Sequence, residues 1–383
     1  MAYVATRGGE AAIQQAEKLF RAEIGDLTPQ RVAEIERALP WLIDRLMGEA
    51  SLYARDIAAL ALAQTGGELY ESVLLLRAWR STQPRLCVAE TVALADTITH
   101  RRISAAFRDL DGGQVLGPTL DYSHRLLRAE VLRGETFRPE PVDPAAAPHP
   151  ARLPALTDWQ AAAGLLDRAQ AEATPAGDIP DLTRAPLLLP APRAMRLQAL
   201  ARADTGATLG LGYSAQRGYA SAHPTVNELR LAEADIMVRH PSGTAFSAGR
   251  VRLSSCEMVA KTAAPSGKGE TLSMGFTATL GWNEVKVIAG STLDLNMNLA
   301  PNPEARGPAG DEEFVLYHTE PLEASGFCIH LKLPHYVTFQ SALDALRGIT
   351  RDGPVPRSPD DVAAEADARL AAEAAGEPGD TPA

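Results

Sequence analysis

This 383-residue sequence has few cysteines, no long apolar run and no excess of positive charge. Each of these features excludes a class of protein. The three cysteines, Cys87, Cys256 and Cys328, are far apart and odd in number, so they form neither a disulfide framework nor a CxxC motif. The net charge of -11 leaves no general basic surface for nucleic acid. No apolar run approaches the roughly 20 residues of a membrane-spanning helix, and the first residues lack the apolar segment of a signal peptide. We therefore expect a cytoplasmic protein with reduced thiols, and neither nucleic acid nor a membrane as its partner.

The length favours two domains, and the patterning along the chain divides it further. Apolar residues recur at helical spacing through the first part, where Thr28-Pro29 predicts a helix N-terminus. Six prolines within residues 136–156 predict an exposed connection. We predict an α+β fold, with a mainly helical N-terminal part followed by a mixed α/β C-terminal domain. The predicted boundaries are 1–135 for the helical domain, 136–193 for the Pro-rich connecting region, 194–345 for the mixed domain and 346–383 for a disordered acidic tail.

Three local patterns sharpen this prediction. A short helix is expected from Asp158 to Glu172 in the connecting region. Within the mixed domain, Asp235-Ile-Met-Val and residues 326–333 are apolar runs typical of strands. Gly210-Leu-Gly212 lacks the third glycine of a dinucleotide-binding fingerprint and is expected at a strand edge or turn.

Arginines gather ahead of a glycine-rich turn at Arg101-Arg102-Ile-Ser-Ala-Ala-Phe-Arg108, and Asp121-Tyr-Ser-His124-Arg125 follows. Guanidinium groups beside flexible backbone suit a polyphosphate, because both match phosphate oxygens. A solvated helix face is the alternative. Gln216-Arg217 forms a second polar cluster, for which an ordinary loop is the alternative. Cys256-Glu257 is expected to be a buried cysteine beside a surface glutamate.

Histidines and carboxylates gather near the C-terminal end of the mixed domain. His330 and His335 are five residues apart, so neither helix nor strand spacing places them on one face, but a turn at Pro334 would let the imidazoles converge on Zn²⁺. Two ligands are an incomplete zinc site, and two unrelated histidines are the alternative. The missing ligands would come from His318, Asp311 or Glu312, from substrate, or from another chain.

Seven sequence blocks, in this order, resemble subunit I of the bacterial carbon–phosphorus lyase core complex. The blocks are Arg101–Ala105, Gly112–Thr119, Asp121–Leu127, Gln216–Tyr219 with His223-Pro224, Cys256–Met258, Asp311–Leu316 and His330–Tyr336. The start of the chain, Tyr3–Glu10, is also similar to that family, so the resemblance covers roughly residues 1–345. The Pro-rich segment, the loop 261–271 and the acidic tail depart from the family, and all three fall between or beyond the blocks.

The resemblance implies a role in phosphonate assimilation. The family acts with G, H and L partner subunits on MgATP and an alkylphosphonate such as methylphosphonate. The phosphonate oxygen replaces adenine at ribose C1′, giving α-D-ribose 1-methylphosphonate 5-triphosphate, and subunit I is the nucleosidase-like component. The J subunit, a radical enzyme, breaks the carbon–phosphorus bond later. Mg²⁺ enters with ATP as substrate, and the resemblance places Zn²⁺ on His330 and His335 near the J subunit.

Displacing adenine passes through an oxocarbenium-like transition state, which requires nearby negative charge and an oriented nucleophile. Asp311, Glu312 and Glu313 are the expected catalytic carboxylates, together with His318. The anionic substrate groups are expected to bind Arg102, Arg125 and Arg217, with His124 and Gln216 as hydrogen-bond partners. Two alternatives stay open: a non-catalytic scaffold subunit of the same complex, and a free-standing purine nucleotide glycosidase.

Overall fold

The computed structural model describes residues 9–123, 125–166, 179–219, 223–263, 269–299, 307–332 and 337–349, together with Ala364 and Ala368. By its contacts the chain divides into two compact units. The larger unit is Gln15–His330, and the smaller consists of Met1–Gln14 and Leu331–Ala383. His124, His335 and nearly all of the predicted acidic tail lie outside the described residues. The domain boundaries predicted at 135, 193 and 345 remain predictions.

Residues 9–82 are mainly helical, as the apolar periodicity predicts. The helices are α1 (Gly9–Ile24), α2 (Pro29–Ala38), α3 (Pro40–Ala50), α4 (Arg55–Gln64) and α5 (Leu69–Thr82). The Thr28 hydroxyl accepts a hydrogen bond from the backbone N–H of Arg31 at 3.2 Å, and Pro29 occupies the first helical turn, so the predicted start of α2 is confirmed. Apolar side chains of α3, α4 and α5, including Ile43, Leu62 and Leu76, form one buried core.

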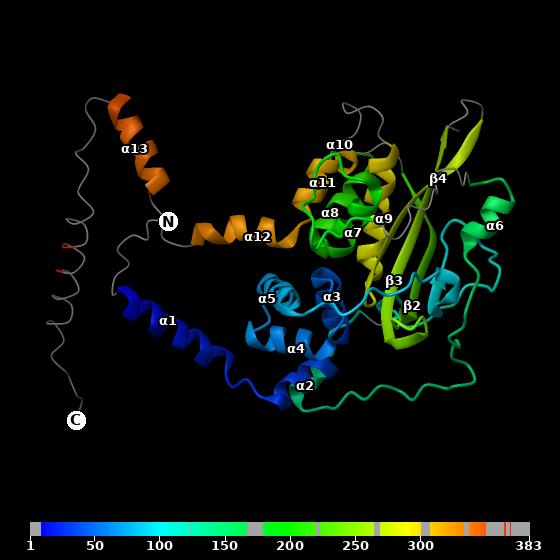
Figure 1. The fold of residues 1–383 in the computed structure, drawn as a ribbon. Helices are drawn as coiled ribbons and strands as arrows, with labels where there is room; N and C mark the ends of the chain where they lie inside the picture. The colour runs from blue at the N-terminus through cyan, green and yellow to red at the C-terminus, as the bar shows by residue number, and fades with distance from the viewer. Residues whose placement is uncertain are drawn as a thin grey trace. The chain divides into compact units, whose positions relative to one another are not determined.

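A four-stranded antiparallel sheet is the centre of the larger unit (Figure 1). Its strands run in sequence order: β1 (Ile98–Ile103), β2 (Thr225–Arg239), β3 (Ala245–Ala263) and β4 (Glu270–Leu280). The expected strand at Asp235-Ile-Met-Val lies in β2 and is confirmed. Strand β1 lies within the range predicted to be mainly helical, and it pairs with β2, so that Ile98 is opposite Glu233 and Arg102 is opposite Arg230. The predicted α+β class is confirmed, and its sheet includes this N-terminal strand.

Helix α9 (Glu284–Leu299) lies against one face of the sheet and packs with α7 (Arg193–Arg202) and α8 (Thr205–Gln216), as Figure 1 shows. Residues 210–212 are therefore helical, and the expectation of a strand edge or turn is wrong. Gly212 is needed for packing, because a Cβ there would stand 3.1 Å from Cα and Cβ of Ala289 in α9.

The region after the sheet is helical throughout its described part. It contains α10 (Gly307–Gly310), α11 (Glu312–His318), α12 (Pro321–Ile329), η7 (His330–Lys332) and α13 (Val337–Ile349). The strand expected over residues 326–333 is wrong for residues 326–332, which are helical, and Leu333 lies outside the described residues. Glu320 caps α12 and Pro321 occupies its first turn. Backbone hydrogen bonds of a helix are local, so they form here without a neighbouring strand.

Most of the Pro-rich stretch is exposed and irregular, as predicted, although Leu153 and Leu156 at its end are buried. Three short 3₁₀ turns lie ahead of it and one helix lies at its end. These elements are η1 (Leu94–Asp96), η2 (Leu120–Tyr122), η3 (Ala129–Arg133) and α6 (Leu156–Ala162). The helix expected over residues 158–172 is thus present in its first part, and residues 167–178 lie outside the described ranges. No helix in those ranges has both the length and the apolar character to cross a membrane.

Candidate functional site

The acidic trio stands at the start of α11, but its members have different partners. The Asp311 carboxylate accepts a hydrogen bond from the backbone N–H of Phe314 at 2.8 Å, which makes Asp311 the N-cap of the helix. Glu312 accepts from the backbone N–H of Ala191 at 2.5 Å and pairs with Arg196 at 3.5 Å. Both carboxylates therefore hold α11 in place. Glu313 is exposed and makes no hydrogen bond or ion pair within the described residues.

His318 is exposed at the last turn of the same helix. Its Nδ1 lies 2.7 Å from the carbonyl oxygen of Phe314, so Nδ1 carries a proton and donates it, and its ring stacks on that of Phe314 at 4.0 Å between centroids. Nε2 is left to accept or deliver a proton at the surface of α11.

Arg102 is not a surface cation. Its side chain is fully buried on β1, and Nε and Nη2 donate to Glu228 at 3.2 and 3.0 Å. Nη1 donates to the carbonyl of Asp111 at 2.6 Å. Arg230, opposite Arg102 on β2, donates to the other oxygen of Glu228 at 2.6 Å. The predicted phosphate ligand thus belongs to a buried Arg–Glu–Arg triad that fixes the turn at Asp111 and Gly113 to the sheet.

Glu257 is a residue that the sequence reasoning placed wrongly. It was expected at the surface, but its side chain is only 5% exposed. It lies opposite Glu228 in the β2–β3 pairing, so two carboxylates face the same buried region. Burial, and after it the charge of Glu228, raises the pKa of Glu257 to about 7, although a hydrogen bond from Asn227 at 2.9 Å opposes the shift. Cys256 is buried as expected, and burial raises the pKa of its thiol.

Arg125 and Arg217 are the predicted phosphate ligands that do stand at the surface. Arg125 pairs with Asp121 at 2.9 Å, four residues away in an exposed turn. Arg217 follows α8 and donates to the hydroxyl of Tyr213 at 3.3 Å. Gln216 donates to the carbonyl of Pro224 at 3.4 Å, which ties the end of α8 to the start of β2. No hydrogen bond or ion pair among the described residues links these groups to the acidic trio.

His330 ends α12 as its C-cap residue and is exposed, with its ring edge against Phe327 at 5.1 Å between centroids. The described residues therefore supply one accessible imidazole of the predicted zinc pair. Nowhere in the described ranges do three His, Cys, Asp or Glu side chains converge as a metal site requires. An exposed imidazole fits a metal whose remaining ligands come from elsewhere, and Zn²⁺ binding stays a prediction.

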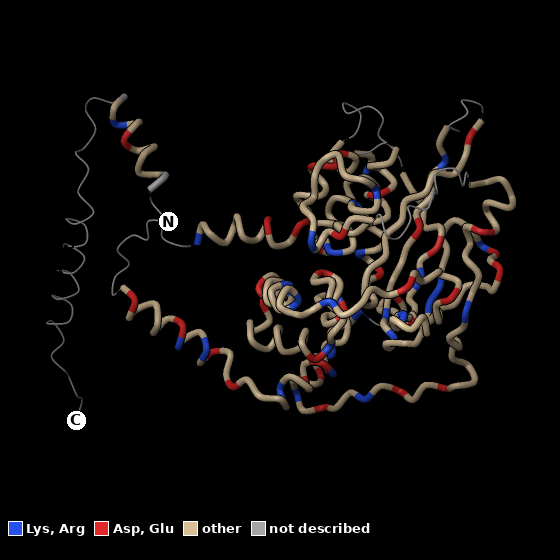
Figure 2. The backbone as a smooth tube through the Cα atoms, in the orientation of Figure 1, with Lys and Arg blue, Asp and Glu red and all other residues tan. Residues whose placement is uncertain are grey.

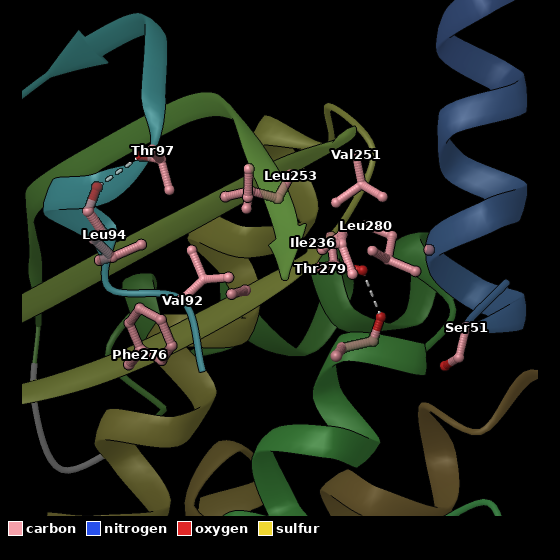
Figure 3. Close-up of a pocket in the computed structure, with 14 residues that line it drawn as sticks. Ser51, Val92, Leu94, Thr97, Ile236, Val251, Leu253, Phe276, Thr279 and Leu280 are labelled. Atoms are coloured by element: carbon pink, nitrogen blue, oxygen red, sulfur yellow. Dashed lines mark hydrogen bonds between the residues drawn. The ribbon is translucent and has the colours of Figure 1, made fainter. Parts of the chain in front are cut away.

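The sheet also borders an apolar cavity of about 440 Å³ (Figure 3). Its lining comes from β2, β3 and β4, from residues 92–97, from α7 and from the end of α3, and includes Val92, Ile236, Leu253 and Phe276. No charged side chain lines it, so it does not suit a triphosphate. Figure 2 shows Lys and Arg interspersed with Asp and Glu along the described chain.

The fold and these side chains define an α+β protein with a charge-rich interior and with exposed arginines, Arg125 and Arg217, suited to an anionic ligand. The chain belongs to the PhnI family of bacterial phosphonate metabolism proteins, whose family model matches residues 2–353. The "Alpha-D-ribose 1-methylphosphonate 5-triphosphate synthase subunit PhnI" of Rhizobium meliloti is 40% identical over 357 residues, which cover 91% of this chain and 95% of the relative.

Two further relatives are equally similar. The Escherichia coli protein that carries the same name is 40% identical over 91% of this chain and 99% of its own length. The "Putative C-P lyase subunit protein HtxH" of Stutzerimonas stutzeri is 40% identical over 91% of this chain and 95% of its own length. The range that the family model matches, residues 2–353, includes the sheet, the acidic trio and both histidines.

Proposed function

We propose that this chain is the subunit of a carbon–phosphorus lyase system that displaces adenine from MgATP at ribose C1′ with an alkylphosphonate. With methylphosphonate the product is α-D-ribose 1-methylphosphonate 5-triphosphate. The observation that carries this proposal is the 40% identity, over 91% of the chain, to two proteins named as subunits of that synthase. The G, H and L subunits are its proposed partners in the reaction, the J subunit acts on the product, and the setting is the cytoplasm.

The proposed reaction exchanges two bonds at one carbon. The bond from C1′ to the adenine nitrogen breaks, its electron pair leaves with adenine, and adenine takes up a proton. A phosphonate oxygen forms the new bond to C1′. The sugar is oxocarbenium-like between these events, so a carboxylate near C1′ and a proton donor near adenine each lower the barrier.

Glu313 is our first candidate for the carboxylate near the sugar. It is the member of the acidic trio whose side chain makes no hydrogen bond or ion pair within the described residues, and it is exposed. His318 is the candidate proton donor or acceptor, because its Nδ1 is held by the Phe314 carbonyl and its Nε2 is free of that bond. Asp311 and Glu312 position the helix that carries both groups.

The triphosphate and the phosphonate require cations that are accessible to them. Arg125 and Arg217 meet this requirement, with Gln216 and His124 as neighbouring hydrogen-bond partners, although His124 lies outside the described residues. Arg102 acts indirectly in this proposal: it fixes the glycine-rich turn ahead of Arg125 through its bond to Asp111.

His330 and His335 are the proposed Zn²⁺ ligands, and the other positions on the metal fall to substrate or to a partner chain. When bound there, Zn²⁺ supplies Lewis acidity toward an oxyanion. Mg²⁺ arrives with ATP as part of the substrate. The exposed position of His330 at the end of α12 supports the sharing of this site with another molecule.

A scaffold subunit is the second candidate, and specific contacts favour it. Asp311, Glu312 and Arg102 are all engaged in structural bonds, and Phe327 beside His330 is 72% exposed, as an apolar contact with a partner would be. In this case the partner subunits would supply the catalytic groups.

The test is adenine release from ATP, followed by chromatography, with the chain alone and with the G, H and L subunits. Release that depends on both methylphosphonate and the other subunits is the expected result. Release by the chain alone into water would identify a glycosidase. Adenine release that persists when Glu313→Gln and His318→Ala are combined would assign the chemistry to the partners, with Glu34→Gln, an exposed change on α2, as the matched control.

A further inference from the structure

The face of the sheet away from α9 carries charged side chains. Leu229 of β2 packs with Val287 of α9, whereas the alternate residues Glu228 and Arg230 point to the opposite face. Apolar and polar residues alternate in this way when one face of an antiparallel sheet is in water. Glu228 and Arg230 are nevertheless buried, because a covering segment, residues 151–162, lies over them and includes α6. Figure 1 shows α6 on the other side of the sheet from α9.

Hydrogen bonds to charged side chains hold the covering segment in place. The carbonyl of Pro154 accepts from Nη2 of Arg102 at 3.1 Å and from Nη2 of Arg230 at 3.2 Å. The backbone N–H of Leu156 donates to Glu228 at 3.3 Å. Water can replace each of these partners when the segment lifts away, so the bonds oppose its departure only modestly.

Little apolar surface holds the covering segment down. Of residues 151–162, only Leu153 and Leu156 are buried apolar side chains, and α6 makes no extensive contact with another described helix or strand. Residues 135–150, which lead into the segment, contain no helix or strand and are almost entirely exposed. Segments with few buried apolar contacts open locally at a lower free energy than the core of a protein does.

The covering segment also touches the glycine-rich turn that contains Gly112. A Cβ on Gly112 would stand 2.8 Å from Cδ2 of Leu153. The rings of Phe107 and Trp159 meet edge to face, with 5.5 Å between their centroids. Arg102 donates hydrogen bonds both to the turn and to the covering segment. An opening of the segment would therefore loosen the turn as well.

A buried chain of hydrogen bonds connects α6 to a titratable group. Gln160 of α6 donates from Nε2 to Oδ1 of Asn227 at 2.6 Å, and Asn227 donates from Nδ2 to Oε1 of Gln160 at 3.0 Å. The same Nδ2 group donates to the Glu257 carboxyl group at 2.9 Å. The position of α6 is thus coupled, through one amide, to the protonation of Glu257.

Glu257 has no cation bound to it that would favour its ionised form. The charged side chains that act on it are Glu228, Arg230 and Arg102, and both arginines bind Glu228. Phe276 of β4 lies opposite Glu257, and Asp158 of α6 is exposed, so neither adds a charge beside it. Burial, and after it the charge of Glu228, raises the pKa of Glu257 to about 7. Once ionised, Glu257 faces another carboxylate out of water, and hydration on opening relieves this cost.

We propose that residues 151–162 form a lid that opens from the charged face while the sheet stays folded, and that the proton on Glu257 holds the lid closed. Opening frees the guanidinium donors that the carbonyls of Leu153 and Pro154 occupy. The inference concerns a motion and not a reaction, so it goes beyond the proposed function and does not depend on it.

The test is hydrogen–deuterium exchange of the full chain, purified with its partner subunits, followed by peptide mass spectrometry. Peptides from the lid and from residues 108–115 should exchange at least roughly 100-fold faster than peptides from the middle of β2, because only the former open locally. Exchange of the lid and of β2 at the same rate would overturn the proposal. No turnover is measured, so this result leaves the ribosyl-transfer proposal untouched.

A pH series of the same measurement tests the role of Glu257. After correction for the intrinsic pH dependence of amide exchange, the open fraction of the lid should rise roughly 30-fold between pH 5 and 7, since the open form ionises first. Glu257→Gln should abolish the rise, and Glu34→Gln on the exposed side of α2 should keep it. An open fraction that is constant in wild type over this range, or that rises as steeply in Glu257→Gln, would contradict the proposal.

A further variant loosens the lid without touching Glu257. Gln160→Ala removes both hydrogen bonds between α6 and Asn227, so it should raise the open fraction roughly 10-fold while β2 peptides keep their rates. Gln30→Ala at an exposed position of α2 is the matched control and should change neither. If Gln160→Ala speeds exchange in β2 as much as in the lid, the two unfold together and there is no separate lid. The wild-type series decides the case if a variant does not fold.

Discussion

Glu257 should give the stability of this protein a pH dependence that a single substitution removes. Its pKa lies near 4.5 when exposed and is raised to about 7 in the folded chain, chiefly by burial. Below pH 4.5 both states are protonated, and the stabilisation from this group is complete. As pH rises from 4.5 to about 7, the unfolded chain releases the proton while the folded chain retains it, so stability falls through this window. The resulting loss of unfolding free energy is at most about 3 kcal/mol.

Glu257→Gln removes the titrating group and preserves its main contact. The glutamine oxygen can still accept the hydrogen bond that Asn227 donates to Glu257 at 2.9 Å. The charge opposite Glu228 disappears, so the cost of two facing carboxylates is relieved. The variant should match wild type near pH 4.5 and exceed it by up to about 3 kcal/mol at pH 8.

Urea unfolding followed by circular dichroism at several pH values between 4.5 and 8 measures this difference. Glu34→Gln is the matched control, since it makes the same chemical change at an exposed position of α2 and should follow wild type throughout. If Glu257→Gln loses stability with rising pH as steeply as wild type, the folded protein does not hold its proton on Glu257 and the reasoning is wrong.

Four further outcomes follow from the same contacts. Glu228→Gln leaves two buried guanidiniums without their counter-charge and should cost roughly 3–5 kcal/mol in urea unfolding; a loss below about 1 kcal/mol would contradict the triad's role. Glu313→Gln should reduce turnover by roughly 10²–10⁴ with little change in ATP affinity, and near wild-type turnover would make this residue structural. His330→Ala and His335→Ala should each remove zinc from the purified complex by elemental analysis, whereas full zinc in the double variant would refute that site. Deletion of residues 352–383, which are acidic and proline-dotted, should leave the melting temperature and the bound partners unchanged, unlike a tail that packs on the fold.

Features encoded by neighbouring residues were predictable from the sequence. Thr28-Pro29 marked the start of α2, because a cap and its helix are adjacent in the chain. At α12 the prediction rests on the apolar run at 326–333, which resembles a strand, whereas the structure has a helix that begins at Pro321. A short apolar run by itself does not distinguish helix from strand.

Features that depend on distant residues were not predictable. Strand β1 exists because it pairs with β2, more than a hundred residues later, and no local pattern records that pairing. The same pairing brings Glu228 to Arg102 and turns a predicted phosphate ligand into a buried structural group. Glu257 is buried because β3 lies inside the sheet, between β2 and β4, which its two neighbours in sequence do not reveal.

For the candidate site residues, the sequence groups the acids into one segment but does not distinguish what each side chain contacts. The acidic trio does begin one helix, but its members differ. Asp311 caps α11, Glu312 accepts a hydrogen bond from Ala191, and the Glu313 side chain makes no hydrogen bond or ion pair within the described residues. The sequence does not reveal this difference, because the hydrogen bond of Glu312 is made to Ala191, which lies 121 residues away in the chain.

The central claim is that a phosphonate oxygen, rather than water, replaces adenine at C1′. Methylphosphonate labelled with ¹⁸O in all three oxygens, supplied with MgATP to the complex with the G, H and L subunits, tests this claim directly by mass spectrometry. The account predicts one equivalent of adenine for each ribose 1-methylphosphonate 5-triphosphate, with all three labelled oxygens retained and one of them bonded to C1′. Adenine released together with unlabelled ribose 5-triphosphate, and no labelled product, would contradict it.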